Sequence, residues 1–252
     1  MQALTPLQPS SHISWLSRCW LYCAYFVVTV LFRLLCRVHI EGGEDIPRHG
    51  GVVLVSNHRS GFDTLLIPYT IFKLQKPQFV RAPAKAELFR FALLRALLSS
   101  VGAFPVRRGQ SDFRAIRQIL QYMQTEKIMI FPEGTRSRDS TLQPGKRTVG
   151  KLLYQTRPVV IPTAIVGTEG IFTRRQGLGD WRVPIAIRYG APLDLQGYYA
   201  LPNTKETAEA ILKEVMGAIA ALLYNTSQPS VSSYRSPKPP RLQGTPDAPS
   251  AT

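Results

Sequence analysis

Apolar and polar positions alternate along the middle of the chain with the periods of short strands and of helices. Apolar runs of strand length lie at 51–57, 78–83, 103–106, 127–131, 158–167 and 181–190. Stretches with helical spacing lie between them, at 62–72, 86–98, 111–124 and 146–156. Strands and helices that alternate at these lengths predict an α/β fold, a single domain with a mostly parallel central sheet flanked by helices.

A further helix is predicted near the C-terminus, where apolar residues from Ala208 to Leu222 form one face. Asn203 is expected to cap this helix, with Glu206 three residues later completing a capping box. Residues 226–252 hold six prolines and six serines in 27 positions and few large apolar groups. Such a segment cannot bury enough surface to order itself, so we predict a disordered tail without a catalytic part.

The N-terminal region carries an apolar run with no charge over the 14 residues from Cys19 to Phe32, flanked by Arg18 and Arg33. As a helix this run would be roughly 21 Å long, shorter than the roughly 30 Å hydrocarbon core of a bilayer. Tryptophan and tyrosine side chains around it are typical of the lipid–water interface. We predict that residues 1–40 form a membrane-seated helical segment, with a helix packed on a soluble core as the alternative. Removal of residues 1–38 is expected to leave the rest folded.

Cysteine and histidine usage gives no indication of a metal site or a disulfide framework. The three cysteines, Cys19, Cys23 and Cys36, all lie in the apolar N-terminal region. Their odd number favours a reducing compartment. The four histidines show neither HExxH nor any other metal-ligand spacing, so no metal is predicted.

The chain is strongly basic, with a formal net charge of +15, and residues 57–151 hold 17 Lys and Arg against 6 Asp and Glu. Such an excess predicts an anionic partner, which could be nucleic acid, an acidic membrane surface or a phosphorylated substrate. A general solubility charge is the alternative. No nucleic-acid-binding motif is present, so nucleic acid is not the expected partner.

The stretch SNHRSGFD, residues 56–63, follows a predicted strand and places His58 five positions before Asp63. A histidine can accept a proton near neutral pH, and a carboxylate on its other ring nitrogen fixes the tautomer and supports the imidazolium. The pair therefore predicts a general base, although this spacing alone often arises by chance. Ser60 is not expected to be a nucleophile, because the G-x-S-x-G elbow is absent.

A second stretch, FPEGTRSR at 131–138, also follows a predicted strand, where α/β folds place their ligands. Glycine lets backbone N–H groups approach an anion, and Arg136 and Arg138 can bind phosphate with both guanidinium nitrogens. Glu133 can orient an arginine or a substrate hydroxyl. We predict a phosphate site here, although the P-loop pattern is absent.

Taken together, these stretches resemble the glycerolipid acyltransferases, in particular the 1-acyl-sn-glycerol-3-phosphate acyltransferases of the bacterial and plastid type. The first family motif matches Asn57, His58 and Asp63, and the third matches Phe131 to Ser137 completely. The second motif matches 102–108, with Lys85, Glu87 and Leu88 upstream, and the fourth matches 160–162. Two departures, Arg59 and Arg107, stand where the family more often has an uncharged and an acidic residue, and would make the pocket more positive.

The resemblance implies an O-acyltransferase that needs no cofactor and produces phosphatidic acid. His58 would deprotonate a glycerol hydroxyl of lysophosphatidic acid, which attacks an acyl thioester of acyl-carrier protein or coenzyme A, and Asp63 would support His58. The residues implied to bind the acceptor's phosphate are Lys85, Arg108, Glu133, Gly134, Thr135 and Arg136. The helix at 86–98 would line the acyl-chain groove or touch lipid, with an ordinary core helix as the alternative.

The expected organisation is the membrane segment at 1–40, an acyltransferase domain at 41–225 and the tail at 226–252, on the cytoplasmic face of a membrane. Glycerol-3-phosphate or another lysophospholipid is the alternative acceptor. A non-catalytic basic protein that binds membranes or nucleic acid is the alternative from a different class.

Overall fold

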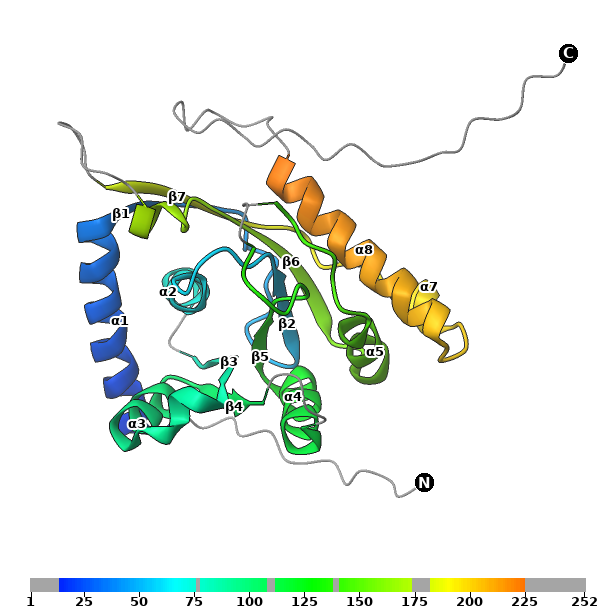
Figure 1. The fold of residues 1–252 in the computed structure, drawn as a ribbon, viewed down its shortest axis with the longest axis horizontal. Helices are drawn as coiled ribbons and strands as arrows, with labels where there is room; N and C mark the ends of the chain where they lie inside the picture. The colour runs from blue at the N-terminus through cyan, green and yellow to red at the C-terminus, as the bar shows by residue number, and fades with distance from the viewer. Residues whose placement is uncertain (1–13, 76–77, 108–111, 138–140, 174–181, 225–252) are drawn as a thin grey trace, which may run out of the picture.

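A seven-stranded sheet forms the centre of the part of the chain that the computed structural model describes, residues 14–75, 78–107, 112–137, 141–173 and 182–224 (Figure 1). The strands are β1 (Cys36–Glu41), β2 (Val52–Ser56), β3 (Val80–Lys85), β4 (Ala103–Val106), β5 (Lys127–Ile130), β6 (Val159–Val166) and β7 (Val183–Tyr189). Their order in the sheet is β1-β7-β6-β2-β5-β3-β4. Only the β6–β7 pair is antiparallel among these, which confirms the predicted mostly parallel α/β fold.

Helices cover both faces of this sheet (Figure 1). The helices are α1 (Trp15–Leu35), α2 (Asp63–Leu74), the 3₁₀ helix η1 (Ala86–Arg90), α3 (Ala92–Ser100), α4 (Phe113–Thr125), α5 (Arg147–Thr156), α6 (Gly170–Thr173), α7 (Gln196–Tyr199) and α8 (Lys205–Tyr224). Figure 1 shows α1 and α2 on one side of the sheet and α4, α5 and α8 on the other.

Strand β2 explains why the sheet needs a helical layer on each face. Its side chains alternate between two hydrophobic clusters: Val52 and Leu54 pack with α1 and α2, while Val53 and Val55 pack with α4, α5 and α8. A parallel strand buried on both faces is a continuous apolar run, which is what the sequence GVVLV contains.

Three local expectations were wrong. Residues 36–40, assigned to the helical segment, belong to edge strand β1, which pairs with β7. In β1 the polar Arg37, His39 and Glu41 alternate with Cys36, which is buried, and with Val38 and Ile40, which are partly buried, and this obscures the strand pattern. The single helix predicted at 86–98 is divided into η1 and α3 by an extended residue at Phe91. Thr204, and not Asn203, caps α8, because its hydroxyl accepts the N–H of Thr207.

The predicted tail at 226–252 lies outside the described residues.

Helix α1 is longer than predicted, with 21 residues and a length of roughly 31 Å. Its inner face packs on α2, where Tyr25 stacks on Phe72 with ring centroids 4.0 Å apart and Phe32 is buried. Its outer face exposes Trp15, Leu16, Phe26, Val27, Val30 and Leu34. By length and mean hydropathy, 1.5, α1 is the one described helix that could cross a membrane.

Candidate active site

The candidate residues meet at the edge of the sheet where the parallel strands β2, β5, β6 and β3 end. Asn57 and His58 follow β2, and Phe131 begins the loop after β5. Lys85 is the last residue of β3. This is the edge where open α/β sheets place their ligands.

The side chains of His58 and Asp63 form a buried pair at this edge. His58 Nδ1 lies 2.9 Å from Asp63 Oδ2, and the two residues are 7% and 0% exposed. The same carboxylate oxygen accepts the backbone N–H groups of Arg59 at 2.7 Å and Ser60 at 2.8 Å. These two bonds explain why the HRSGF turn folds back and carries the first residue of α2 to the histidine.

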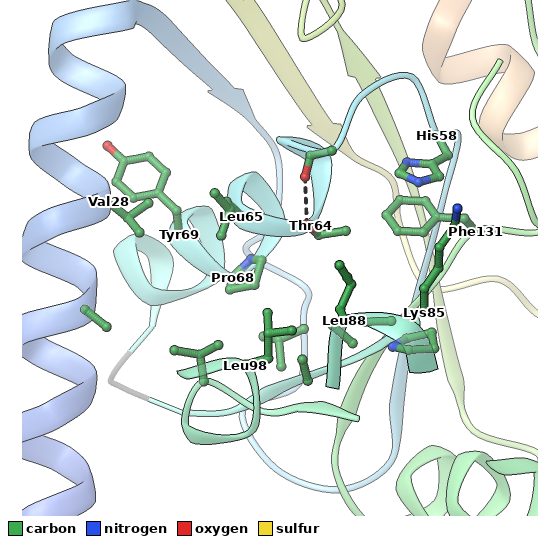
Figure 2. A pocket seen from close by; sticks show the side chains of 18 of the residues that line it. Val28, His58, Thr64, Leu65, Pro68, Tyr69, Lys85, Leu88, Leu98 and Phe131 are labelled. Atoms are coloured by element: carbon green, nitrogen blue, oxygen red, sulfur yellow. Dashed lines mark hydrogen bonds between the residues drawn. The ribbon is translucent and has the colours of Figure 1, made fainter. Parts of the chain in front are cut away.

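Phe131 sets the plane of the His58 ring. The two rings stack with centroids 4.1 Å apart and an interplanar angle of 16°. Figure 2 shows both rings at the wall of a cavity, with Lys85 nearby. With Nδ1 directed at Asp63, Nε2 is the nitrogen left for chemistry.

The loop after β5 holds the backbone of His58 from both sides. Glu133 Oε1 accepts the His58 N–H at 2.8 Å, and the Ser137 N–H donates to the His58 carbonyl at 2.8 Å. Glu133 Oε2 accepts the N–H of Gln143 at 2.9 Å. Burial raises the pKa of the Glu133 carboxyl, and the two backbone donors oppose this. Its oxygens therefore bind backbone amides, which differs from the expected contact with a substrate phosphate.

Asn57 ties β2 to β6 beyond the last paired residues of the two strands. Its side-chain amide donates to the Ile165 carbonyl at 2.8 Å and accepts the Ile165 N–H at 2.8 Å. The side chain thus replaces one residue of strand pairing. This contact fixes the loop that carries His58 relative to the end of β6.

The residues expected to bind phosphate occupy different places. Lys85, Thr135 and Arg136 line the cavity that His58 also lines. Glu133 and Gly134 are not among the described residues that line the cavity. Gly134 has a φ of 71°, and a Cβ at this position would collide with the side chain of Lys146, so the turn requires glycine. Arg108, like Arg138, lies outside the described residues.

The cavity has a volume of about 1000 Å³. Three of its polar lining residues, Lys85, Thr135 and Arg136, are exposed to solvent and form its mouth, and most of the remaining lining is apolar. Its apolar wall is built by α1, α2, β3, η1, α3 and β4 (Figure 2). The residues of this wall are Leu21, Ala24, Val28, Leu65, Pro68, Phe72, Val80, Ala82, Leu88, Leu98, Val101 and Ala103. Leu88 and Leu98 line it while Leu93 and Leu97 of α3 are exposed, so the 86–98 region contributes both to a groove and to an apolar surface.

Arg59 does not add net charge to the site, contrary to the expectation from the sequence. Its buried guanidinium Nη1 lies 2.8 Å from Glu169 Oε1, which balances its charge. No group of three or more His, Cys, Asp and Glu residues that could hold a metal ion occurs within the described ranges.

The fold and the site together define an α/β enzyme in which a histidine, paired with a buried aspartate, lines a largely apolar cavity that lysine and arginine side chains also line. The family model described as Acyltransferase matches residues 37–166, just over half of the chain. The chain therefore belongs to the acyltransferase family.

Several relatives of this chain are named 1-acyl-sn-glycerol-3-phosphate acyltransferase. The chloroplastic 1-acyl-sn-glycerol-3-phosphate acyltransferase BAT2 of Brassica napus is 30% identical over 169 residues, which cover 63% of this chain and 47% of that protein. The 1-acyl-sn-glycerol-3-phosphate acyltransferase of Bacillus subtilis strain 168 is 27% identical over 189 residues, 74% of this chain and 88% of that protein. The chain spans about half the length of the first plant and spirochaete relatives it matches.

A solved structure shares the fold. The crystal structure of the 1-acyl-sn-glycerophosphate (LPA) acyltransferase PlsC from Thermotoga maritima has a TM-score of 0.57, with 23% sequence identity and 81% of each chain covered. At this identity the similarity establishes the fold alone.

Proposed function

We propose that this protein transfers an acyl chain from an acyl thioester to the free hydroxyl of 1-acyl-sn-glycerol-3-phosphate and so produces phosphatidic acid. The observation that carries the proposal is the cavity in which His58 lies, with cations at its mouth and apolar walls behind them. An acceptor with a phosphate, a hydroxyl and a fatty chain matches these three features. The names of the plant and bacterial relatives support the same acceptor.

His58 is the general base of the proposed reaction. Nε2 takes the proton of the acceptor hydroxyl while the oxygen of that hydroxyl attacks the carbonyl carbon of the thioester. The C–S bond then breaks, and the leaving thiolate takes the proton from the imidazolium. Asp63, bonded to Nδ1 at 2.9 Å, holds the reactive tautomer and stabilises the imidazolium. Such general-base action contributes about 10²–10⁴ in rate.

The acceptor's phosphate binds at the mouth of the cavity. Lys85 and Arg136 supply positive charge from two different strand ends, and Thr135 supplies a hydroxyl donor. Arg108 belongs to the same set by its place in the family motif. Glu133 and Gly134 serve the site indirectly, because they build the turn that presents Thr135 and Arg136 and holds His58.

The apolar body of the cavity accommodates an acyl chain, and either acyl-carrier protein or coenzyme A supplies the thioester. Glycerol-3-phosphate is the alternative acceptor, in which case the apolar wall would hold only the acyl chain of the donor. The test is a panel of acceptors with both donors: lysophosphatidic acid, glycerol-3-phosphate and, as the matched molecule without phosphate, a monoacylglycerol. Transfer to lysophosphatidic acid should exceed transfer to monoacylglycerol; equal transfer would contradict the phosphate site.

Replacing Arg136 by alanine should raise the KM for lysophosphatidic acid about 10- to 100-fold and leave the donor KM within about twofold. The reason is the loss of a charge-assisted bond to phosphate, worth about 1.5–3 kcal/mol. Steady-state kinetics with each substrate varied in turn provide the measurement. Arg117→Ala, an exposed arginine of α4 that does not line the cavity, is the matched control. A rise confined to the donor KM would assign Arg136 to the other substrate.

The outer face of α1 and the exposed residues of α3 form the surface that binds the membrane in this proposal. Trp20 Nε1 donates to Ser100 Oγ at 2.9 Å and joins the two helices. Because the inner face of α1 packs on α2, α1 lies within one leaflet and places the cavity at the depth of the headgroups. The basic flanks favour the cytoplasmic leaflet, where anionic lipids and acyl donors are found.

The double variant Phe26→Asp/Leu93→Asp should lower recovery on anionic vesicles at least about tenfold, because each apolar side chain contributes roughly 1.5–3 kcal/mol when it leaves water. Both residues are exposed, so the fold should stay intact. Leu201→Asp, an equally apolar exposed residue beyond α7, is the control. Vesicle sedimentation measures binding, and circular dichroism checks folding. Unchanged sedimentation of the double variant would place the membrane contact elsewhere.

A further inference from the structure

The carboxylate of Asp63 is held by a residue outside the four motif stretches. Thr168 Oγ1 donates to Asp63 Oδ1 at 2.6 Å, and both residues are 0% exposed. The other oxygen, Oδ2, receives His58 Nδ1 and two backbone N–H groups. The hydroxyl of Thr168 therefore binds the carboxylate oxygen that does not contact the histidine.

The backbone fixes the position of Thr168. Asn57 holds Ile165 near the end of β6, three residues before Thr168. Gly167 follows with a φ of 94°, and a Cβ on it would lie 2.2 Å from the Pro184 carbonyl oxygen, so the turn requires glycine. The Gly170 N–H donates to the Gly167 carbonyl at 3.1 Å and closes the turn.

A second contact joins the same two loops. Glu169, the neighbour of Thr168, forms the 2.8 Å ion pair with Arg59, the neighbour of His58. Thr168 and Glu169 thus contact the HRSGFD loop at two points. The loop after β6 is therefore fastened directly to the loop that carries the histidine–aspartate pair.

We propose that Thr168 is a positioning residue for Asp63 in the acyl transfer reaction, an inference that rests on the proposed function because Asp63 acts through His58. The terminal torsion of an aspartate is broad, so a carboxylate held at one oxygen only can rotate. A donor at Oδ1 keeps Oδ2 directed at His58 Nδ1. The Thr168 hydroxyl also gives Asp63 Oδ1 a hydrogen bond in a site without access to water, where a carboxylate oxygen without a donor would be unfavourable.

The test is a series of substitutions that separates the hydroxyl from the shape of the side chain. Thr168→Ser keeps the donor and should hold kcat within about threefold of wild type. Thr168→Val keeps the shape without the donor and should lower kcat about 10- to 100-fold, the equivalent of one charge-assisted hydrogen bond. Both KM values should stay within about twofold, because Thr168 is 0% exposed and does not line the cavity. Thermal unfolding checks that each variant is folded.

Three results would overturn the inference: wild-type kcat in the valine variant, an equal loss in the serine and valine variants, or a loss confined to KM. Should the valine variant fail to fold, Thr168→Cys replaces it in the test. A thiol is a weaker hydrogen-bond donor than a hydroxyl, so the cysteine variant must have a lower kcat than the serine variant. His58→Ala is measured in the same assay. If it is inactive while the threonine series is flat, only this inference fails; if it turns over normally, the proposed mechanism fails.

Discussion

Replacing His58 by alanine is expected to lower kcat about 10²- to 10⁴-fold, the contribution of a positioned general base. His58 lines the cavity with Nδ1 bonded to Asp63, so Nε2 is the ring nitrogen that can accept the proton of the acceptor hydroxyl. The expected loss corresponds to roughly 3–5 kcal/mol of activation free energy. The measurement is kcat for lysophosphatidic acid at saturating donor, with wild type and variant at equal concentration.

The controls for this variant test its fold and its substrate binding. The alanine variant loses the ring contact with Phe131 and the hydrogen bond to Asp63, but it removes no residue of the two hydrophobic clusters. Its thermal unfolding should stay cooperative, and its vesicle binding should match wild type. A folded His58→Ala protein with wild-type turnover would contradict the mechanism.

Asp63→Asn should lower kcat by up to about 10⁴-fold, because the neutral amide cannot stabilise the imidazolium as the carboxylate does. The geometry of the pair survives this change. The amide oxygen can face the three N–H donors that now meet Oδ2, while the amide nitrogen donates to Thr168 Oγ1. The variant therefore isolates the charge of the carboxylate from its role in holding the turn.

Asp63→Ala is the comparison for this variant. It removes the acceptor for the Arg59 and Ser60 N–H groups as well as the charge. It should unfold at a lower temperature than Asp63→Asn, while both lose activity. Activity of the asparagine variant within about tenfold of wild type would show that the carboxylate charge is not needed, contrary to the magnitude expected for such a dyad.

The sequence predicts best those features that depend on neighbouring residues. The strand GVVLV and the His58–Asp63 spacing lie within one stretch, so a turn that joins the two side chains can be inferred locally. The partners of this pair cannot be inferred in the same way. Thr168 lies 105 positions from Asp63, and Ile165 lies 108 positions from Asn57; only the pairing of β2 with β6 brings them together.

Glu133 illustrates a second limit. A carboxylate between a proline and a glycine, followed by arginines, suggests a contact with substrate or arginine. The sequence does not show that its two oxygens meet the backbone N–H groups of His58 and Gln143. Its residue type was informative, but its role depends on how two loops pack.

The N-terminal segment shows a third limit. Its apolar run predicts a membrane contact, and the outer face of α1 is exposed as that requires. The same run also buries Phe32 against α2, and the strand that follows starts at Cys36. Deletion of residues 1–38 would remove the buried Phe32 and half of β1, so this truncation would perturb the fold as well as the membrane contact. Point substitutions on the outer face are the appropriate test.

The most direct test of the central claim is formation of phosphatidic acid from lysophosphatidic acid and an isotope-labelled acyl thioester, followed by mass spectrometry of the lipid product. Acyl-carrier protein and coenzyme A thioesters are each supplied, with wild type and His58→Ala compared in parallel. We expect labelled phosphatidic acid with wild type and at least one donor, and at most about one hundredth of that rate with His58→Ala. Wild-type protein that binds lipid but forms no labelled product with either donor, or a His58→Ala variant that forms as much as wild type, would contradict the account.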